Sequence, residues 1–420
     1  MYLFYNILLF LLLPIFPFIL IYKEIRGKRY LNSFFIRMGS GLKEKNDSQK
    51  PSILIHGVSV GEIITLEPIV KMISRDDKYQ IYISSITETG FLMAQKKYLK
   101  YGAKIVFFPF DFPFSVKRFL KEVSPEKIVI AETELWPNFL RIAKKMGIKI
   151  FIINGRLSEK SFSKYKFFKH FFKKVLKNVD AVFAKSNEDA RKFKEIGCNE
   201  KKIFIMGNLK FDIPMDERLN EKLLKEMKSK LTPGKILIYG SVMEGEEEIL
   251  LKLFKKLREK ERISLIFAPR HIERTGYIED LIRKMNLSYF KRSDIKKSST
   301  KREIMILDTL GELKQIYSIG DIVVIGGSIL PHGGHNPLEP IIWGKPVITG
   351  PHMENFREIV EILKEAGGIS ITEGTTQLEE NILKLIRNEE MAREIGKKGF
   401  LTLKKNRGWS EKIYKWIVKS

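Results

Sequence analysis

The feature that most constrains the fold is an alternation through most of the chain, in which a short apolar run is followed by a turn and a helical pattern. Strands that alternate with helices are joined by right-handed crossovers and form parallel sheets. A first series of candidate strands lies at residues 53–56, 81–84, 105–108, 128–131, 151–153, 181–184 and 203–206. A second series lies at residues 236–239, 264–268, 304–307, 322–325 and 347–349. The sequence therefore predicts an α/β protein with parallel sheets.

The two series begin alike, which suggests two similar halves. Residues 53–62 read I-L-I-H-G-V-S-V-G-E and residues 236–246 read I-L-I-Y-G-S-V-M-E-G-E. Each reads as a strand, a glycine turn and a Ser-x-x-Glu capping box at a helix start. The predicted boxes are Ser59 with Glu62 and Ser241 with Glu244. Because 420 residues are too many for one ordinary core, we expect two Rossmann-like domains that face a cleft.

Composition shifts suggest where these parts begin and end. We expect an apolar anchor at residues 1–22, a basic flank and linker at 23–50, a first domain at 51–212, an inter-domain linker at 213–233 and a second domain at 234–420. The last helix is a candidate to pack back on the first domain.

The amino-terminal segment is apolar enough for a membrane anchor. Residues 3–22 carry no charge and match the length of a helix that crosses a bilayer once. Lys23, Arg26, Lys28 and Arg29 follow, so the positive-inside rule leaves the body on the cytoplasmic side. A cleaved signal peptide is the alternative, but the basic flank lies on the wrong side and no A-x-A-like site follows. We expect a single-pass membrane anchor.

The net charge of +25 indicates an anionic partner. Residues 161–178 interleave lysines with aromatics, a pattern typical of a helix on an anionic membrane surface and equally of an ordinary packed helix. The expected apolar face is Tyr165, Phe168, Phe172 and Leu176, and the expected basic face is Lys166, Lys169, Lys173 and Lys177. Nucleic acid is disfavoured as the partner because the chain contains no nucleic-acid-binding motif. The single cysteine, Cys198, excludes an intramolecular disulfide and a cysteine-rich metal site.

Residues 321–351 have the densest functional pattern. Two apolar strand-like runs enclose two glycine pairs, Gly326 with Gly327 and Gly333 with Gly334, and the histidines His332 and His335. Such a crossover lies at the carboxyl edge of a parallel sheet, where ligands bind, and its glycines let the backbone approach a ligand closely. Asn336 reads as the N-cap of a helix, with Pro337 at N1 and Glu339 in the first turn. Pro340 predicts that this helix starts irregularly. Capping alone would also explain Asn336 and Glu339, without a role in ligand binding.

Several charged residues follow other predicted strands and share that edge. Glu62 follows the first strand and could be only a capping residue, in which case the helix start would make it a stronger acid. Glu132 and Glu134 could bind metal, but no His/Cys cluster supports them. Arg156, Lys210 and Arg270 together describe a site for phosphate and carboxylate. The backbone of Gly311, Glu312 and Leu313 could recognise a flat base.

Eight blocks of the chain resemble the signature blocks of the 3-deoxy-D-manno-octulosonic acid (Kdo) transferases. They are H-G-V-S-V-G-E, A-E-T-E-L-W-P-N, N-G-R-L-S, K-S-N-E-D-A, G-N-L-K-F-D, A-P-R-H-I-E-R, D-T-L-G-E-L and G-G-H-N-P-L-E-P, in order from about His56 to Pro340. The resemblance implies a GT-B glycosyltransferase with an amino-terminal acceptor domain and a carboxyl-terminal CMP-sugar domain. It implies inverting transfer of Kdo from CMP-Kdo to a lipid A precursor at the cytoplasmic face of the inner membrane, without a metal or cofactor.

The same resemblance assigns roles to residues. Glu62 would be the proton acceptor, with Glu132 and Lys210 stabilising the transition state. CMP would be bound by Pro269, Arg270, Gly311, Glu312, Leu313, Asn336, Pro337, Leu338 and Glu339. Arg156, Lys166, Lys169 and Lys173 are the candidates for contact with the acceptor and the membrane. Val242 and Met243 depart from the Thr-His that the resemblance leads us to expect. A nucleotide-sugar epimerase of the same fold and a non-catalytic membrane-tethered binding protein are the alternatives.

Overall fold

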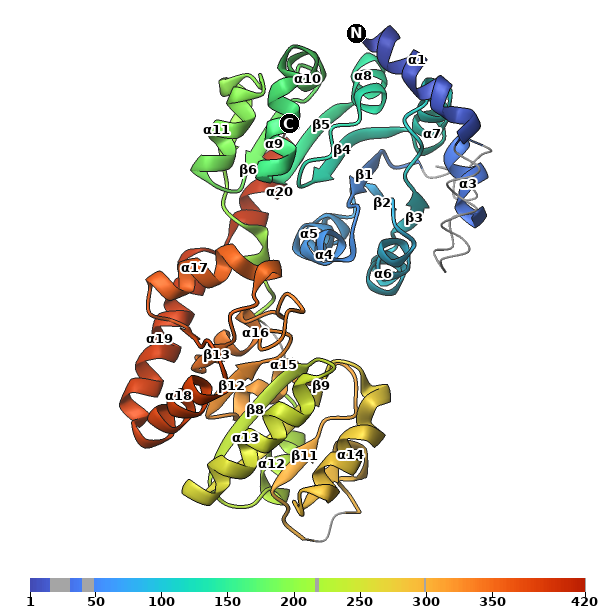
Figure 1. Ribbon diagram of the computed structural model, residues 1–420. Coiled ribbons are helices and arrows are strands. Elements are labelled where there is room, and N and C mark those ends of the chain that lie inside the picture. The colour runs from blue at the N-terminus through green and yellow to red at the C-terminus, as the bar shows by residue number, and fades with distance from the viewer. Residues whose placement is uncertain (16–30, 40–48, 216–218, 298–299, 420) are drawn as a thin grey trace. The chain divides into compact units, whose positions relative to one another are not determined.

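The computed structural model describes residues 1–15, 31–39, 49–215, 219–297 and 300–419 (Figure 1). Its contacts divide the chain into two compact units. Unit 1 comprises Met1–Asp212 and Arg407–Ser420, and unit 2 comprises Ile213–Asn406. The final helix, α20 (Trp409–Lys419), therefore belongs to unit 1, where Ile413 and Ile417 lie in its core.

Unit 1 is built on a seven-stranded sheet in the order β3-β2-β1-β4-β5-β6-β7, in which every pairing is parallel. The strands are β1 (Ser52–His56), β2 (Gln80–Ser85), β3 (Lys104–Phe107), β4 (Pro125–Ala131), β5 (Lys149–Gly155), β6 (Ala181–Ala184) and β7 (Ile203–Ile205). The predicted first series is thus confirmed. The strand order reverses between β1 and β4, and such a switch point opens a crevice at the carboxyl ends of the strands.

Helices cover both faces of this sheet. They are α1 (Tyr2–Leu12), α3 (Leu31–Met38), α4 (Val60–Thr65), α5 (Glu67–Asp76), α6 (Glu88–Tyr98), α7 (Pro113–Val123), α8 (Pro137–Lys145), α9 (Glu159–Phe167), α10 (Lys169–Leu176), α11 (Asn187–Glu195) and α20. Successive residues of β1 alternate between two cores, because Leu54 packs in one hydrophobic cluster while Ile53 and Ile55 pack in the other. That alternation is the two-residue period of a strand buried on both faces.

Unit 2 has a second seven-stranded parallel sheet in the order β10-β11-β9-β8-β12-β13-β14. The strands are β8 (Lys235–Val242), β9 (Ile263–Pro269), β10 (Tyr289–Lys291), β11 (Ile304–Ile306), β12 (Ile322–Ile325), β13 (Val347–Thr349) and β14 (Ser370–Ile371). The helices are α12 (Glu221–Lys230), α13 (Glu246–Lys260), α14 (Thr275–Lys284), α15 (Leu313–Ile316), α16 (Leu338–Ile341), α17 (Arg357–Glu365), α18 (Thr375–Arg387) and α19 (Glu389–Lys405). The second predicted series is confirmed, and here the order reverses between β8 and β12. The short edge strands β10 and β14 were not predicted.

Two local expectations differ from the structure. The segment expected as an inter-domain linker contains α12, which buries Leu224 and Met227 and is part of unit 2. The single helix expected at residues 161–178 is instead two helices, α9 and α10, that meet at Phe168 with φ −96° and ψ 30°. Phe168, at this break, is 57% exposed, whereas Leu176 of the same expected apolar face is buried.

The amino-terminal segment is described only as far as residue 15. Helix α1 is followed by one 3-10 turn (Leu13–Ile15), and residues 16–22 of the expected span, with the basic residues after it, lie outside the described residues. In the part of the chain that the structure describes, no helix has the length and apolar character to cross a membrane.

Helix α1 turns polar side chains toward the body of unit 1. The Tyr5 hydroxyl donates to Asp111 Oδ2 at 2.9 Å, and Asn138 Nδ2, in α8, donates to Asn6 Oδ1 at 2.6 Å. The Arg141 guanidinium lies over the Tyr2 ring at 4.6 Å. The opposite side of the helix exposes Leu3, Phe4, Ile7, Leu8 and Leu11. The helix therefore presents an apolar face outward, the reverse of an ordinary surface helix.

Candidate active site at the carboxyl ends of the strands

Glu62 lies at the switch point of unit 1, in the first turn of the helix that follows β1. Ser59 is the N-cap of α4, and its Oγ accepts from the Glu62 backbone N at 3.4 Å. The Glu62 carboxylate returns this interaction, because Oε1 accepts from Ser59 Oγ at 2.9 Å and Oε2 accepts from Val58 N at 2.7 Å. The predicted capping box is thus confirmed, with Val58 N in place of the cap residue's own N–H.

Burial decides the acidity of Glu62. It raises the pKa of the carboxyl, the hydrogen bonds from Val58 and Ser59 lower it, and the charge on Glu132 raises it again. The net direction is upward, so the expectation that the helix start makes Glu62 a stronger acid was wrong. The residue is a stronger base than an exposed glutamate.

Glu132 follows β4 with a backbone that few residue types adopt. Its φ is 57°, in the left-handed region, and its N–H donates to Ile153 O at 2.9 Å. Its carboxylate pairs with Arg156 Nε at 3.1 Å. Left-handed non-glycine residues concentrate at functional sites, where the surrounding structure compensates their strain. The pairing also places Arg156 beside the carboxylates.

Glu134 is the third carboxylate of this group. Burial is the main reason that its pKa rises to about 7, and the charge on Glu62 adds to the shift. Among the described residues, no group of three or more His, Cys, Asp or Glu is arranged to hold a metal ion. Burial and neighbouring negative charges thus raise the pKa of both Glu62 and Glu134.

Lys210 is held at the same sheet edge by a residue that sequence analysis missed. Lys210 lies in a 3-10 turn (Leu209–Phe211), and the Leu209 N–H donates to Asn154 Oδ1 at 3.1 Å. Asn154, near the end of β5, has φ 52°. The only sequence signal is an asparagine before Gly155 at a strand end, because asparagine tolerates this conformation.

The lysines proposed for the membrane lie on the α9–α10 segment. Lys166 pairs with Glu195 at 2.9 Å, while Lys169 and Lys173 are exposed on α10. Phe167, at the junction of the two helices, is 83% exposed. The segment thus shows both aromatic and basic groups to the outside.

In unit 2 the ends of β8 and β12 lie against each other at the switch point. Gly326 N donates to Gly240 O at 2.7 Å, and a Cβ on Gly326 would meet Ser241 O at 2.5 Å. Ser241 itself has φ 59°. The capping box predicted for Ser241 and Glu244 is wrong, since Ser241 belongs to β8 and α13 begins at Glu246 with Gly245 as its N-cap.

The residues expected to bind the donor base and phosphate follow β9 and β11. Pro269 ends β9, and Arg270 comes next, with its N–H donating to Val242 O at 2.8 Å and its side chain exposed. Gly311 has φ 86°, and Glu312 pairs with Arg292 at 2.8 Å immediately before α15 begins at Leu313.

The segment after β12 carries the other donor candidates. Asn336 Oδ1 accepts from Leu338 N at 3.1 Å, and Asn336 Nδ2 donates to Glu339 Oε1 at 3.4 Å. Helix α16 begins at Leu338, with Pro337 as its N-cap, one residue later than predicted. His335 lies in the same segment: burial lowers the pKa of its imidazole to about 4, and the positive charge of Arg270 lowers it further. His335 is therefore neutral at physiological pH.

Gly333 and Gly334 have a packing role that the sequence did not indicate. Their φ angles are 88° and 74°. A Cβ on Gly333 would meet Asn355 Nδ2 at 2.5 Å, and one on Gly334 would collide with Met353. Close packing within the chain thus accounts for a glycine at both positions.

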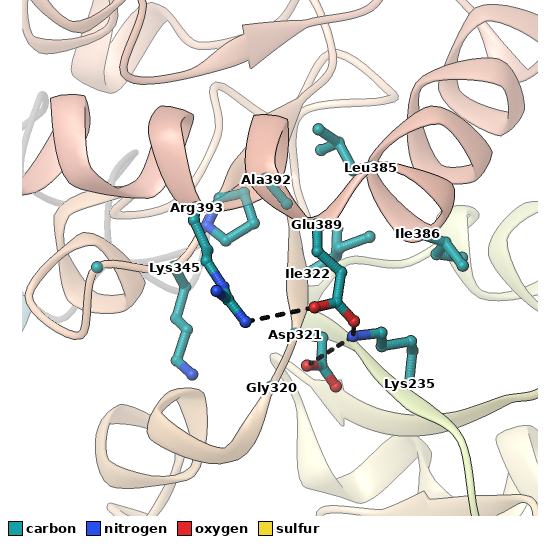
Figure 2. Close-up of a pocket in the computed structure, with 12 residues that line it drawn as sticks. Lys235, Gly320, Asp321, Ile322, Lys345, Leu385, Ile386, Glu389, Ala392 and Arg393 are labelled. Carbon is teal, nitrogen blue, oxygen red and sulfur yellow. Dashed lines mark hydrogen bonds and ion pairs between the residues drawn. The ribbon is translucent and has the colours of Figure 1, made fainter.

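A cavity of about 200 Å³ in unit 2 lies away from these residues, at the amino ends of β8, β12 and β13 (Figure 2). Arg393 pairs with Glu389, Glu389 with Lys235, and Lys235 with Asp321 across its wall (Figure 2). Lys345 is the fifth charged residue of the lining. Three cations and two carboxylates nearly balance, so the lining favours neither an anion nor a cation.

Comparisons with known proteins identify the family. A family model described as 3-Deoxy-D-manno-octulosonic-acid transferase (kdotransferase) matches residues 32–213, and one described as Glycosyl transferases group 1 matches residues 220–401. The 3-deoxy-D-manno-octulosonic acid transferase of Haemophilus influenzae is 33% identical over 370 residues, which are 86% of this chain and 85% of that protein. The chain belongs to the Kdo transferase family. The resemblance of the signature blocks is confirmed, and the protein is a glycosyltransferase.

Solved structures show the GT-B-like fold alone. A glycosyltransferase from Rickettsia africae is 18% identical with a TM-score of 0.56, and the match covers 89% of this chain and 100% of that one. A UDP-GlcNAc 2-epimerase from Neisseria meningitidis is 14% identical with a TM-score of 0.58, and the match covers 88% of this chain and 100% of that one. Because a transferase and an epimerase share the fold, membership of the Kdo transferase family decides between these activities.

Proposed function

We propose that the chain transfers Kdo from CMP-Kdo to a hydroxyl of a lipid A precursor, lipid IV(A), in lipopolysaccharide biosynthesis. The observation that carries the proposal is the position of Glu62, a half-buried carboxylate at the switch point of unit 1 with a raised pKa. A general base works best when its pKa approaches the working pH.

The proposed reaction is a single displacement. Glu62 accepts the proton of the acceptor hydroxyl while that oxygen attacks the anomeric carbon of Kdo. The bond from this carbon to the CMP phosphate breaks, and CMP leaves with the electron pair, so the configuration inverts. Each carboxylate oxygen has two lone pairs, which allows Glu62 to take the proton without giving up its hydrogen bonds to Ser59 and Val58.

Cationic side chains would balance the charge of the departing phosphate. Lys210, on the turn held by Asn154, is proposed to stabilise the transition state together with Glu132. Arg270, the 311–313 turn and residues 336–339 are proposed to hold CMP. Lysine and arginine can neutralise a phosphate without a divalent ion, so we propose that turnover is metal-independent and unaffected by EDTA.

A membrane contact fits a lipid acceptor. We propose that the outward apolar face of α1, with the aromatic and basic groups of the α9–α10 segment, attaches the enzyme to the cytoplasmic face of the inner membrane. Apolar side chains on one side and nearby lysines are the combination that anionic bilayers bind.

The test uses the full chain with CMP-Kdo and lipid IV(A) in detergent, with products weighed by mass spectrometry. Glu62→Gln should lower turnover about 10²- to 10⁴-fold, the usual contribution of a general base, and leave CMP affinity by calorimetry unchanged. Wild-type turnover should fall as the pH drops through the raised pKa of Glu62, because only the ionised carboxylate accepts a proton.

Glu126→Gln is the matched control, since Glu126 is exposed at the amino end of β4. It should behave as wild type. Isomerised sugar in place of lipid product, or a Glu62→Gln enzyme with intact turnover, would contradict the proposal.

A further inference from the structure

Among the described residues of unit 2, the most deeply buried carboxylate belongs to Glu246, the first residue of α13. Its exposed fraction is 0%, and among the described residues no cation pairs with it. A buried, unpaired charge is costly unless hydrogen bonds replace its hydration. Glu246 therefore needs strong compensation from its surroundings.

Four backbone N–H groups supply that compensation. Oε2 accepts from Gly327 at 2.6 Å and Met243 at 3.0 Å, and Oε1 accepts from Ile329 at 2.9 Å and Leu330 at 3.2 Å. Three of the four belong to the turn directly after β12, and the fourth belongs to the turn after β8. The carboxylate thus connects the two strand ends at the switch point of the sheet.

Backbone N–H groups that converge in this way form an anion-binding nest. In Rossmann-like folds, glycine-rich turns at the carboxyl edge commonly use such N–H groups to hold a phosphate of the ligand. Here the nest is already filled by a side chain of the same unit. Gly327, Ile329 and Leu330 cannot donate the same N–H groups to a donor phosphate.

The segment that begins in this turn continues to the proposed donor residues. Gly334 N donates to Gly327 O at 2.7 Å, and His332 Nε2 lies 3.0 Å from Glu244 O. Residues 332–339 are therefore tied to the turn that Glu246 holds. A change in the turn would be transmitted to Asn336 and Glu339.

We infer that Glu246 is an internal anion that fills the nest after β12 and positions the nucleotide-binding segment 332–339, leaving the donor phosphate to side chains such as Arg270. Glu246 is a positioning residue, because it acts through the backbone of this segment. The expected effect on CMP binding rests on the proposed donor site. The nest around Glu246 does not, because its hydrogen bonds are independent of any ligand.

The test removes the internal anion and supplies a small one. Glu246→Ala should weaken CMP binding about tenfold or more, since a hydrogen-bonded charged group is lost. Sodium formate, a carboxylate small enough for the vacated space, should restore CMP affinity in a saturable way, whereas sodium chloride should not. Glu248→Ala is the matched control: Glu248 lies on the same helix but is exposed and pairs with Lys252 at 2.6 Å, so it should bind CMP normally, with no response to formate.

Two results would overturn the inference: unchanged CMP affinity in Glu246→Ala, or a loss in the folded variant that formate does not reverse. Glu246→Gln is the second variant. Its NH₂ group would face two N–H donors, so we expect weakened CMP binding that formate cannot restore. Amide hydrogen exchange of the wild type tests the nest without any ligand. Fast exchange at Gly327, Ile329 and Leu330 would show that these N–H groups are not hydrogen-bonded, and would contradict the inference. If the wild type bound no CMP while these amides were protected, the proposed function would fail and the nest would stand.

Discussion

At the scale of single residues, the acidity of Glu62 and Glu134 depends on burial more than on position in a helix. Glu62 was predictable as a capping residue from Ser59 three positions earlier, but its raised pKa was not, because burial depends on residues far apart in the chain. Asn154 was missed for the same reason: its contact with Leu209 joins the ends of two distant segments. The sequence thus indicated which residues gather at the edge and could not indicate their ionisation.

Glu134 gives a prediction for pH and stability. Its pKa is 4.5 in an ordinary environment and about 7 here, so the folded chain holds the proton more tightly and loses stability as the pH rises from 4.5 to 7. Glu134→Gln removes this cost. We expect it to raise the free energy of unfolding by roughly 3 kcal/mol at pH 8 and by little at pH 4.5, since the pKa rises by about 2.5 and each pKa unit corresponds to about 1.4 kcal/mol.

Urea unfolding at both pH values measures the effect. Glu126→Gln, exposed at the other end of β4, should change neither value. An equal gain at both pH values would mean that packing, and not ionisation, explains the difference.

At the scale of elements, strands were easier to predict than caps. Runs such as residues 322–325 are entirely apolar and bounded by glycine, so their ends were found, whereas β14, with only two residues at a sheet edge, left no pattern. The capping box predicted at Ser241 is absent because Ser241 belongs to β8, and the N-cap of the next helix is Gly245. The break at Phe168 was invisible to periodicity, since the residues on either side keep helical spacing.

Helix α1 gives the prediction at this scale. Leu8 on its outward face is 48% exposed, and Leu92 on α6 is 54% exposed, so the two leucines are matched in exposure. If α1 lies against lipid, Leu8→Asp should lower binding to anionic vesicles about tenfold, because a buried leucine contributes about 1.5–3 kcal/mol, and Leu92→Asp should not. Vesicle flotation measures both. Equal binding by the two variants would remove α1 from the membrane contact.

At the scale of the whole molecule, the chain passes from unit 1 to unit 2 and back. Helix α20 completes unit 1: the Trp416 ring contacts Phe151 at 5.8 Å and Phe183 at 5.3 Å, and the buried Lys127 Nζ donates to Ile417 O at 2.8 Å near the end of the helix. The sequence allowed two domains to be recognised from their repeated openings. The assignment of α20 to unit 1 depends on contacts between residues hundreds of positions apart.

A core substitution in the last helix should therefore destabilise unit 1 alone. Ile413→Ala, in the core of unit 1, should lower the unfolding free energy of that unit by about 2–5 kcal/mol and leave unit 2 unchanged. Calorimetry with limited proteolysis would show an early transition and cleavage confined to unit 1. Leu401→Ala, at an exposed site on α19, is the control and should shift neither transition. Loss of unit 2 in Ile413→Ala would contradict the division.

The late arrival of α20 also has a consequence for synthesis on the ribosome. Domains commonly fold in the order in which they emerge. Here every residue of unit 2 is made before residues 407–420, so the aromatic surface of Phe151, Phe183 and Phe204 gains its cover only after all of unit 2 has been synthesised. The unit that is begun first is therefore completed last, and a nascent chain that stalls after Asn406 would expose that surface to chaperones.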